Sequence, residues 1–280
     1  MSERTERLHK RVIYKDWIDK TARDGVEQLT WDLFRQEMGI CMERGRLMTE
    51  SYKQTEGQPE VIRRAKALAY LLENMTLYIK EEELLVGNYA SDPSKVSLPH
   101  EFSVEWENKL FNNGYSHLLD QKARDEWQDI YDYWKDKTIE ARVLAILPEE
   151  VEKHWTYFNA FTAIFGLTNG PIVQAPNFQK LFKVGLNGIM KEAEERMAKI
   201  KSDYASHKMK EDEYISEVNF LEAVMIADKG VIAWAHRYAD LAREMAVKEE
   251  EKQREKALEE IADVCDWIPA NPCRTLRDAM

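Results

Sequence analysis

MERGRLMTESYK at residues 42–53 opens the part of the sequence that decides the fold, and TEGQP (55–59), IRRAKAL (62–68) and ELLVGN (83–88) follow it. Apolar residues recur three and four positions apart here, which predicts amphipathic helices over 29–51 and 59–75. The glycine and proline of TEGQP separate the two helices, because proline suits the first turn of a helix and glycine interrupts one. A short extended piece is expected at 84–86, closed by the Gly-Asn turn that follows it.

The sequence on either side of this stretch predicts a mainly helical chain in two parts. Residues 1–34 are dense in charge and are predicted to form an arm, and residues 35–280 to form one contiguous unit. Within that unit, prolines, glycines, Asn and Asp predict a long irregular connection over 89–120. Two further helical regions are expected, 121–147 ending at Pro148, and 189–264 interrupted near 208–211 and at Gly230.

The composition is that of a globular protein with an acidic surface. Lys and Arg number 40 against 51 Asp and Glu, a net charge of −11, and 44% of the residues are hydrophobic. This sign argues against nucleic acid or a membrane as a main partner, because both attract clustered cations. No run approaches the roughly 18 apolar residues of a transmembrane helix, and the N-terminus has no apolar signal segment. Three cysteines in this setting are typical of reduced thiols, so we expect a cytoplasmic protein.

Motifs for metal, nucleophilic and phosphate chemistry are absent from the sequence. The six histidines and three cysteines form no His-x-x-x-His or Cys-x-x-Cys spacing, so no metal site is predicted. There is no Gly-x-Ser-x-Gly turn and no glycine-rich phosphate loop. Cys41, Cys265 and Cys273 have no His nearby in the sequence and are interpreted as inert, with Cys41 a small buried side chain. No catalytic residue is therefore predicted in this chain.

The best candidate for lining a substrate pocket is the aromatic, glycine-containing stretch 154–178. Rings and amides together offer apolar surface and hydrogen bonds, as small-molecule sites do. Packing beneath a larger domain explains the same stretch equally well. An aromatic stripe at 127–134 is interpreted as core, and Arg63 is expected to pair with a carboxylate such as Glu43 or Glu50. The residues predicted to touch a substrate are Tyr157, Phe158, Asn169 and Asn177.

The phrases quoted at the start resemble, in their order and spacing, the N-terminal region of glycyl radical enzymes, the pyruvate formate-lyase-like family. The resemblance spans the chain after residue 35. It implies a mainly α fold, the N-terminal helical portion of a pyruvate formate-lyase-like α/β barrel, with the barrel largely missing. Further matching phrases are WKDK (134–137), PNF (176–178), GLNG (185–188), WIP (267–269) and RTL (274–276).

Within this family the sequence is most similar to the large subunit of alkylsuccinate and benzylsuccinate synthases. The resemblance implies radical addition of an alkane or alkylarene to fumarate. It departs from many members at Pro171, which stands where they have a His, and at Asn177, which replaces an acid. Another glycyl radical lyase is the alternative: a diol dehydratase, arylacetate decarboxylase, C–S or C–N lyase, or formate acetyltransferase. The phrases that suggest fumarate addition are YWKDK (133–137), AR (141–142), LPEE (147–150) and LFK (181–183).

The resemblance also implies what this chemistry requires. Family members use a thiyl-forming Cys in a Gly-Cys-x-Glu loop and a radical Gly in an Arg-Val-x-Gly-Tyr-like motif, and neither motif occurs here. We expect a truncated N-terminal part of a longer enzyme, which binds no cofactor itself. The implied partners are a radical-S-adenosylmethionine activase that installs the glycyl radical, fumarate, a hydrocarbon, small accessory subunits and a second copy of the chain. A non-catalytic helical interaction module is the alternative of another class, suggested by the long helix over 212–264.

Overall fold

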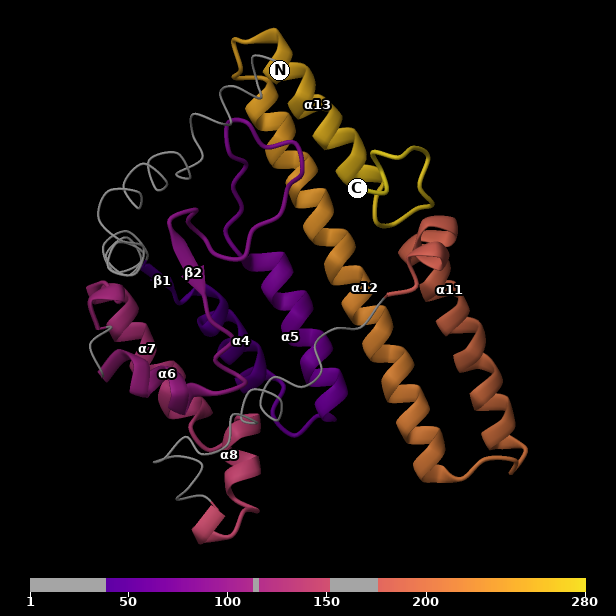
Figure 1. Cartoon of the computed structure of the whole chain (residues 1–280). Coiled ribbons are helices and arrows are strands. Elements are labelled where there is room, and N and C mark those ends of the chain that lie inside the picture. The colour runs from indigo at the N-terminus through magenta and orange to yellow at the C-terminus, as the bar shows by residue number, and fades with distance from the viewer. Residues whose placement is uncertain (1–38, 113–115, 152–175) are drawn as a thin grey trace.

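The structure is a computed structural model, and it describes residues 39–112, 116–151 and 176–280. These residues are mainly helical, as predicted, and β1 and β2 pair in parallel beside the helices (Figure 1). No helix in the described ranges is long and apolar enough to cross a membrane. In chain order the elements are β1 (Gly39–Cys41), α4 (Glu43–Gln54), α5 (Glu60–Asn74), β2 (Lys95–Ser97), α6 (Val104–Leu110), the 3-10 helix η2 (Ser116–Leu118), α7 (Gln121–Trp134), α8 (Ile139–Leu144), α11 (Phe178–Ala205), α12 (Glu211–Ala246) and α13 (Lys252–Trp267).

The aromatic stripe of α7 forms the centre of the first hydrophobic core. Trp127, Ile130 and Trp134 are buried on one face of α7, at the three- and four-residue spacing of a helix. Trp134 packs edge-on against Tyr52 of α4, with ring centroids 4.9 Å apart. Its indole N–H donates to the Thr49 hydroxyl at 2.9 Å, so this buried polar atom is satisfied. The prediction that the stripe is core packing is confirmed.

α5 and α12 run in the same direction and touch through small side chains. Ala65 of α5 packs with Ala223 of α12, and farther along Gly230 lies against Ala69. Because glycine has no Cβ, the two backbones can approach closely at this point. α12 continues through it as one helix of 36 residues. The helix break predicted at Gly230 is therefore wrong, and the glycine serves helix packing instead.

Two arginines of the C-terminal helices donate hydrogen bonds to backbone carbonyls of the N-terminal part. Arg237 of α12 donates to the carbonyls of Leu72 and Met75, at 2.5 and 2.6 Å, where α5 ends. Arg254 of α13 donates to the first and last carbonyls of the turn 80–83, at 2.8 and 2.7 Å. The final carbonyls of a helix lack partners within it, and its dipole favours a cation there. These contacts fasten α12 and α13 to the N-terminal helices.

A second core lies between α12 and α13, which folds back along the C-terminal half of α12 (Figure 1). Tyr238 and Leu258 are almost fully buried in it. The Tyr238 hydroxyl donates to the side-chain oxygen of Asn88, and the Asn88 amide donates to the carbonyls of Thr76 and Ala90 at 2.8 and 2.7 Å. The phrase ELLVGN, which ends at Asn88, is thereby tied to α12.

The predicted boundaries near the N-terminal core differ from the structure for local reasons. The helix predicted over 29–51 begins at Glu43, because residues 39–41 pair with β2 as a strand. The extended piece predicted at 84–86 forms no strand, and the chain bends there. The connection predicted over 89–120 contains β2 and α6. Strands of three residues are too short for a two-residue alternation to reveal them.

The later boundaries differ in a similar way. The helix predicted over 121–147 is divided into α7 and α8, because Thr138 caps a new helix by accepting a backbone N–H at 3.1 Å. The interruption predicted near 208–211 is confirmed, because residues 206–210 separate α11 from α12. A further break separates α12 from α13, rather than falling at Gly230. The charged arm predicted for 1–34 lies outside the described residues.

Candidate functional site

The described part of the chain contains one of the four residues predicted to touch substrate. Asn177 lies within it, and Tyr157, Phe158 and Asn169 lie outside it. Asn177 is the N-cap of α11, where its side-chain oxygen accepts the Lys180 backbone N–H at 3.0 Å. Asn and Asp are equally good N-caps because both offer a short side-chain acceptor. The replacement of an acid by Asn177 therefore preserves the cap.

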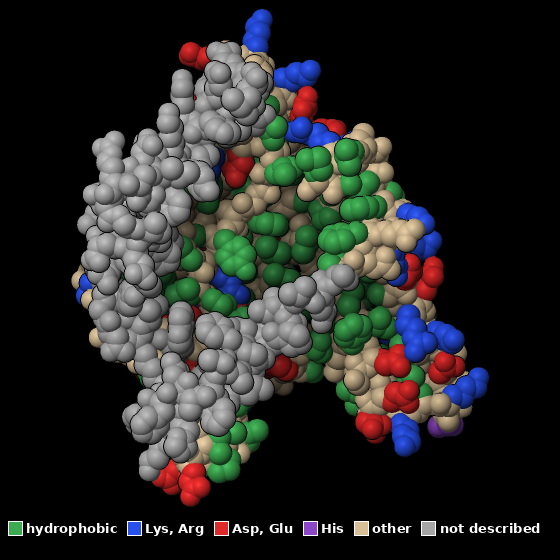
Figure 2. All heavy atoms as spheres, viewed as in Figure 1, with side chains coloured by type: hydrophobic (Ala, Val, Ile, Leu, Met, Phe, Trp, Pro, Cys, Tyr) green, Lys and Arg blue, Asp and Glu red, His purple; other side chains and the backbone are tan. Residues whose placement is uncertain are grey.

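Aromatic side chains follow Asn177 on the first turns of α11. Phe178 is 53% exposed and lies beside Phe182, with ring centroids 5.9 Å apart. On the face of the molecule shown in Figure 2, hydrophobic side chains gather in a central hollow, while charged side chains gather at the far end of the α11–α12 hairpin. Grouped apolar exposure of this kind marks a surface that contacts something else.

Two of the quoted phrases meet in space although they lie far apart in the sequence. The phrase GLNG at 185–188 contacts the loop that follows WIP at 267–269. The backbone N–H groups of Leu186 and Asn187 donate to the carbonyls of Pro269 and Ala270, at 2.9 and 3.0 Å. The turn that carries Asn177 is therefore joined to the C-terminal loop through backbone atoms.

A buried ionic cluster beneath α4 was not predicted from the sequence. Arg44 donates to both carboxylate oxygens of Glu101, at 2.7 and 2.5 Å, although 57 positions separate them. Beside this pair, His100 Nδ1 contacts the Glu107 carboxylate, and the two side chains are 1% and 3% exposed. A Cβ at Gly45 would stand 2.1 Å from the His100 ring, so glycine lets α4 close over the cluster. Burial of this kind fits a structural role, because Glu101, His100 and Glu107 are almost fully enclosed.

The Arg44–Glu101 pair remains charged inside the protein. Burial alone would lower the pKa of the Arg44 guanidinium, but the hydrogen bond and charge of Glu101 outweigh it and raise that pKa. Burial would raise the pKa of Glu101, but the hydrogen bonds from Arg44 hold it below its usual value. Each group thus stabilises the charged form of the other.

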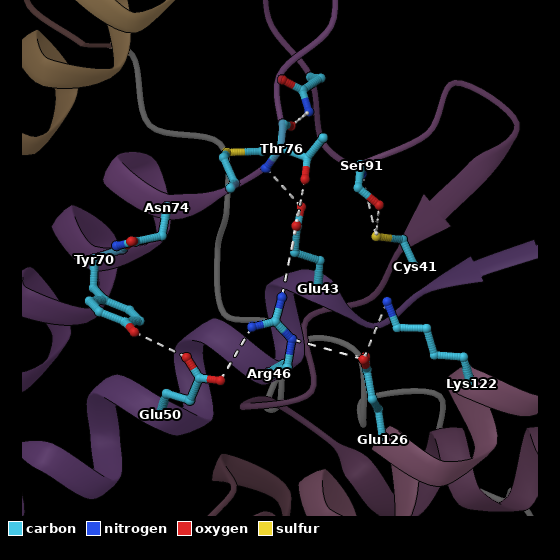
Figure 3. A network of polar contacts seen from close by, with 12 residues as sticks. Cys41, Glu43, Arg46, Glu50, Tyr70, Asn74, Thr76, Ser91, Lys122 and Glu126 are labelled. Carbon is cyan, nitrogen blue, oxygen red and sulfur yellow. Dashed lines mark hydrogen bonds and ion pairs between the residues drawn. The ribbon is translucent and has the colours of Figure 1, made fainter.

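A second polar network lies at the surface where α4, α5 and α7 approach one another (Figure 3). Arg46 lies 3.2 Å from Glu50 and 3.9 Å from both Glu43 and Glu126. Glu43 accepts the backbone N–H of Thr76 at 3.0 Å and its hydroxyl at 2.7 Å. Exposed pairs of this kind contribute roughly 0–1 kcal/mol each. The network ties the start of α4 to the end of α5.

An open pocket of about 170 Å³ adjoins this network. The Cys41 thiol and the Ser91 hydroxyl hydrogen-bond to each other at 3.1 Å in its wall (Figure 3). The charges around the pocket balance, which gives it no preference for an anion or a cation. Its charged lining residues are Glu43, Arg46, Lys95, Asp120, Lys122 and Glu126.

The three cysteine side chains lack the surroundings of a reactive thiolate. Cys41 is buried, as predicted. Burial raises the pKa of Cys265 to about 11, and burial together with the charge of Asp278 raises the pKa of Cys273. Nucleophilic cysteines have a lowered pKa, so Cys265 and Cys273 are poor nucleophiles. No group of His, Cys, Asp and Glu side chains in the described ranges is arranged to hold a metal ion.

The predicted partners of Arg63 are wrong. Arg63 pairs with Glu60, one helical turn earlier, at 3.3 Å, and its guanidinium stacks 4.5 Å from the centre of the Tyr52 ring. Glu43 and Glu50 are occupied by the network around α4. A neighbour on the same helix face is closer than any carboxylate of another helix, which explains the difference.

The comparisons with known proteins agree on one family. All of residues 1–280 match the family model described as pyruvate formate lyase-like. The chain is 33% identical over 258 residues to isethionate sulfite-lyase of Nitratidesulfovibrio vulgaris, an alignment that covers 86% of this chain and 30% of that protein. It is similar to the solved B12-independent glycerol dehydratase from Clostridium butyricum, with a TM-score of 0.75, 30% identity, and coverage of 86% and 30%. A glycyl radical enzyme from Archaeoglobus fulgidus gives a TM-score of 0.72, 30% identity, and coverage of 88% and 31%.

These proteins bear out the predicted fold and the family, and they refine the expected chemistry. The chain spans about 30% of the length of the sulfite-lyase that it matches. Its helical architecture is that of the corresponding part of these enzymes. The relatives are named as a lyase and a dehydratase, and none of those described above is a fumarate-adding enzyme. The chain belongs to the pyruvate formate lyase-like family of glycyl radical enzymes.

Proposed function

We propose that this chain is the N-terminal part of a glycyl radical lyase that cleaves a C–O or C–S bond in a small polar substrate. The observation that carries the proposal is kinship with both kinds of lyase. A sulfite-lyase and a glycerol dehydratase are 33% and 30% identical to the chain, each over 86% of it. One name describes release of sulfite and the other removal of water. Because the chain spans about 30% of each relative, the activity is that of the whole protein.

Radical addition of a hydrocarbon to fumarate is the second candidate, and it rests on phrases such as YWKDK. In the structure these residues serve local packing. Trp134 is core, Lys135 pairs with Asp132 at 3.2 Å, and Lys137 lies 3.7 Å from the centre of the Tyr133 ring. Contacts of this kind are compatible with any reaction. The phrases therefore support the fold more strongly than they support fumarate addition.

The chemistry implied by the family explains which part of the enzyme this chain would supply. Breaking an unactivated C–H bond needs a radical, and a radical survives only where water and oxygen are kept out. The thiyl-forming Cys and the radical Gly of the family have no matching motif in this sequence. Within the proposal, this chain encloses the radical site and supplies part of the wall of the substrate-binding pocket. The whole protein interacts with the activase, a second copy of the chain and small accessory subunits. The wall residues remain those predicted: Tyr157, Phe158, Asn169 and Asn177.

The reaction is tested on the whole gene product, prepared without oxygen and activated by its radical-S-adenosylmethionine partner. Electron paramagnetic resonance gives the glycyl radical per chain, and products are then assayed from separate incubations. Isethionate tests C–S cleavage through released sulfite, and glycerol and propane-1,2-diol test C–O cleavage through an aldehyde product. Toluene or hexane with fumarate tests the second candidate through a substituted succinate. Sulfite or aldehyde formation supports the proposal, and succinate formation alone overturns it.

The binding wall is tested in the same activated enzyme. Alanine substitution of a residue that touches substrate should raise KM or lower kcat at unchanged radical content. Asn74→Ala is the matched control, because Asn74 is an exposed amide whose hydrogen bond at 2.7 Å stays within its own helix. Kinetics equal to this control for Tyr157, Phe158, Asn169 and Asn177 would remove them from the wall.

The helical interaction module is the alternative without catalysis. It predicts a gene product that carries no radical after treatment with the activase and turns over none of these compounds. It also predicts that the 280-residue chain alone unfolds cooperatively and binds little hydrophobic dye. The enzyme reading predicts strong dye binding, because the exposed apolar side chains seen on one face then lack their cover (Figure 2).

A further inference from the structure

The long helix α11 changes direction at Gly185. The residue has φ 63° and ψ 179°, whereas the helix is regular before and after it. Backbone of this kind is essentially restricted to glycine, because a Cβ collides with the neighbouring peptide groups. The helix therefore consists of a short arm, residues 178–184, and a long arm, residues 186–205.

The space around Gly185 is filled by the C-terminal loop. A Cβ at this position would stand 2.5 Å from the Ala270 carbonyl oxygen and 2.7 Å from Asn271 Cα. These obstacles are backbone atoms, which cannot swing aside as a flexible side chain can. Both the conformation and the space at this position thus require glycine.

Three backbone hydrogen bonds fasten the loop across the kink. On the long arm, the N–H groups of Leu186 and Asn187 donate to the Pro269 and Ala270 carbonyls at 2.9 and 3.0 Å. On the short arm, the Phe182 carbonyl accepts the Cys273 N–H at 2.9 Å. Because the loop binds both arms, it sets the angle between them. We call this contact between Gly185 and the 268–273 loop the joint.

The loop is itself held against α13. The Trp267 indole N–H donates to the Pro272 carbonyl at 2.7 Å, and Asn271 donates twice to the Trp267 carbonyl, each time at 3.0 Å. Arg274 binds Asp278 at 3.1 Å and Asp263 of α13 at 2.8 Å. A continuous set of contacts therefore runs from α13 through the loop and Gly185 to the short arm, whose first turn is capped by Asn177.

We propose that Gly185 is a positioning residue for substrate binding: its contact with the 268–273 loop fixes the short arm and so places the Asn177 turn in the binding wall. The inference rests on the proposed function, in which Asn177 belongs to that wall. A displacement of about 1 Å in a group that positions substrate can cost on the order of 100-fold in rate. Replacement of Gly185 therefore acts on substrate through Asn177, at a distance from it.

The test compares Gly185→Ala with Gly57→Ala in the activated whole enzyme. Gly57 also has a positive φ, 84°, but a Cβ there meets nothing within 4 Å. Both variants place alanine at a positive φ, and only Gly185→Ala collides with the loop. We expect kcat/KM to fall at least tenfold in Gly185→Ala relative to Gly57→Ala, mainly through KM, at equal glycyl radical content. Equal kcat/KM in the two variants overturns the proposal.

Two further measurements keep the proposal decidable. If Gly185→Ala does not fold, Trp267→Phe replaces it, because this change removes one anchor of the loop and introduces no clash; it should raise KM in the same direction, and an unchanged KM counts against the joint. In a double-mutant cycle, Gly185→Ala should add little once Asn177 is alanine, and full additivity would show that the joint does not act through Asn177.

Failure of the proposed reaction is distinguishable from failure of the joint. The reaction fails if wild-type enzyme with full radical content turns over no C–O or C–S substrate. Hydrogen–deuterium exchange tests the joint even then, on a peptide that covers 176–188. Faster exchange of that peptide in Gly185→Ala or Trp267→Phe than in Gly57→Ala supports the joint, and equal exchange overturns it.

Discussion

Gly230 of α12 lies against Ala69 of α5, so that a Cβ at the glycine would stand 2.6 Å from Ala69 Cα and 2.9 Å from Ala69 Cβ. Real side chains do not approach a backbone this closely, so Gly230→Ala must push the two helices apart. Overpacking of this kind typically costs about 1–3 kcal/mol of unfolding free energy. We expect a net loss in that range, although alanine is favoured over glycine within a helix by about 1 kcal/mol. Urea-induced unfolding of the wild type and the variant measures it.

The matched control is the neighbouring Lys229→Ala. Lys229 is exposed on the same helix, and surface substitutions usually change stability by less than about 0.5 kcal/mol. A Gly230→Ala protein as stable as the Lys229→Ala protein would contradict the close contact between α5 and α12.

Loss of the buried ion pair beneath α4 should lower the free energy of unfolding by more than Gly230→Ala does. Arg44→Met leaves the Glu101 carboxylate, 7% exposed, without its bidentate partner. Breaking a buried pair from one side typically costs about 3–5 kcal/mol. Arg46→Met is the matched control on the same helix, because Arg46 is 40% exposed and its pairs contribute roughly 0–1 kcal/mol. Thermal unfolding compares the two variants. Equal losses of stability would contradict the prediction that the buried pair contributes more than the exposed one.

The same pair predicts a dependence of stability on pH. Arg44 holds the pKa of Glu101 below its ordinary value of 4.5 in the folded protein. The stabilisation by this ion pair is therefore fully present above the pKa that Glu101 has in the unfolded protein. It is lost as the pH falls through the lower pKa that Glu101 has in the folded protein. We expect the stability difference between wild type and Glu101→Gln to shrink below about pH 4.5. Urea midpoints at pH 7, 5 and 3.5 test this, and a difference that is constant over that range would contradict it.

The elements that were predicted correctly are those whose signal is local. The helix predicted over 59–75 is α5, and the stripe at 127–134 is core, because helical periodicity is read within one segment. The contacts between segments could not be predicted in this way. Arg44 and Glu101 lie 57 positions apart, and Arg237 and Leu72 lie 165 apart. In the sequence, Arg44, Glu101 and Arg237 look like ordinary surface residues, and nothing marks the Leu72 carbonyl as a hydrogen-bond acceptor.

The candidate site shows the same limit in another form. The family was recognisable because its phrases keep their order and spacing, yet the structure assigns several of those residues to packing and capping. Gly185 and the WIP phrase at 267–269 both belong to the matching phrases, but the sequence does not predict that they lie next to each other in the fold. The reaction branch was inferred from residues such as Trp134 that serve the core. A conserved-looking phrase therefore identified the architecture better than it identified the substrate.

Asn177 offers a prediction that separates capping from substrate binding. Asn177→Ala removes the acceptor for the Lys180 N–H and should lower stability by about 1 kcal/mol. Asn177→Asp keeps the acceptor, and its charge interacts favourably with the helix N-terminus, so stability should be unchanged or slightly raised. Thermal unfolding gives the stabilities. If Asn177→Asp is as destabilising as Asn177→Ala, capping does not explain the residue.

Asp228 of α12 gives a pH dependence of the opposite sign. One of its carboxylate oxygens is buried and has no hydrogen-bond partner among the described residues, and burial raises the pKa of the group from 3.8 to about 6. A raised folded pKa stabilises the protein below the unfolded pKa, and this stabilisation is lost as the pH rises through about 6. At pH 7 the carboxylate is charged and poorly solvated, so Asp228→Asn should be more stable than wild type by about 1–3 kcal/mol, at 1.36 kcal/mol for each pKa unit.

The advantage of Asp228→Asn should disappear near pH 4, where the wild-type carboxyl is protonated and resembles the amide. Asp240→Asn is the control, because Asp240 lies on the same helix with its side chain 73% exposed and should show no such pH-dependent gain. Urea midpoints of the three proteins between pH 4 and 7 provide the measurement. A variant less stable than wild type at pH 7 would mean that the charged Asp228 carboxylate has a partner in the folded protein.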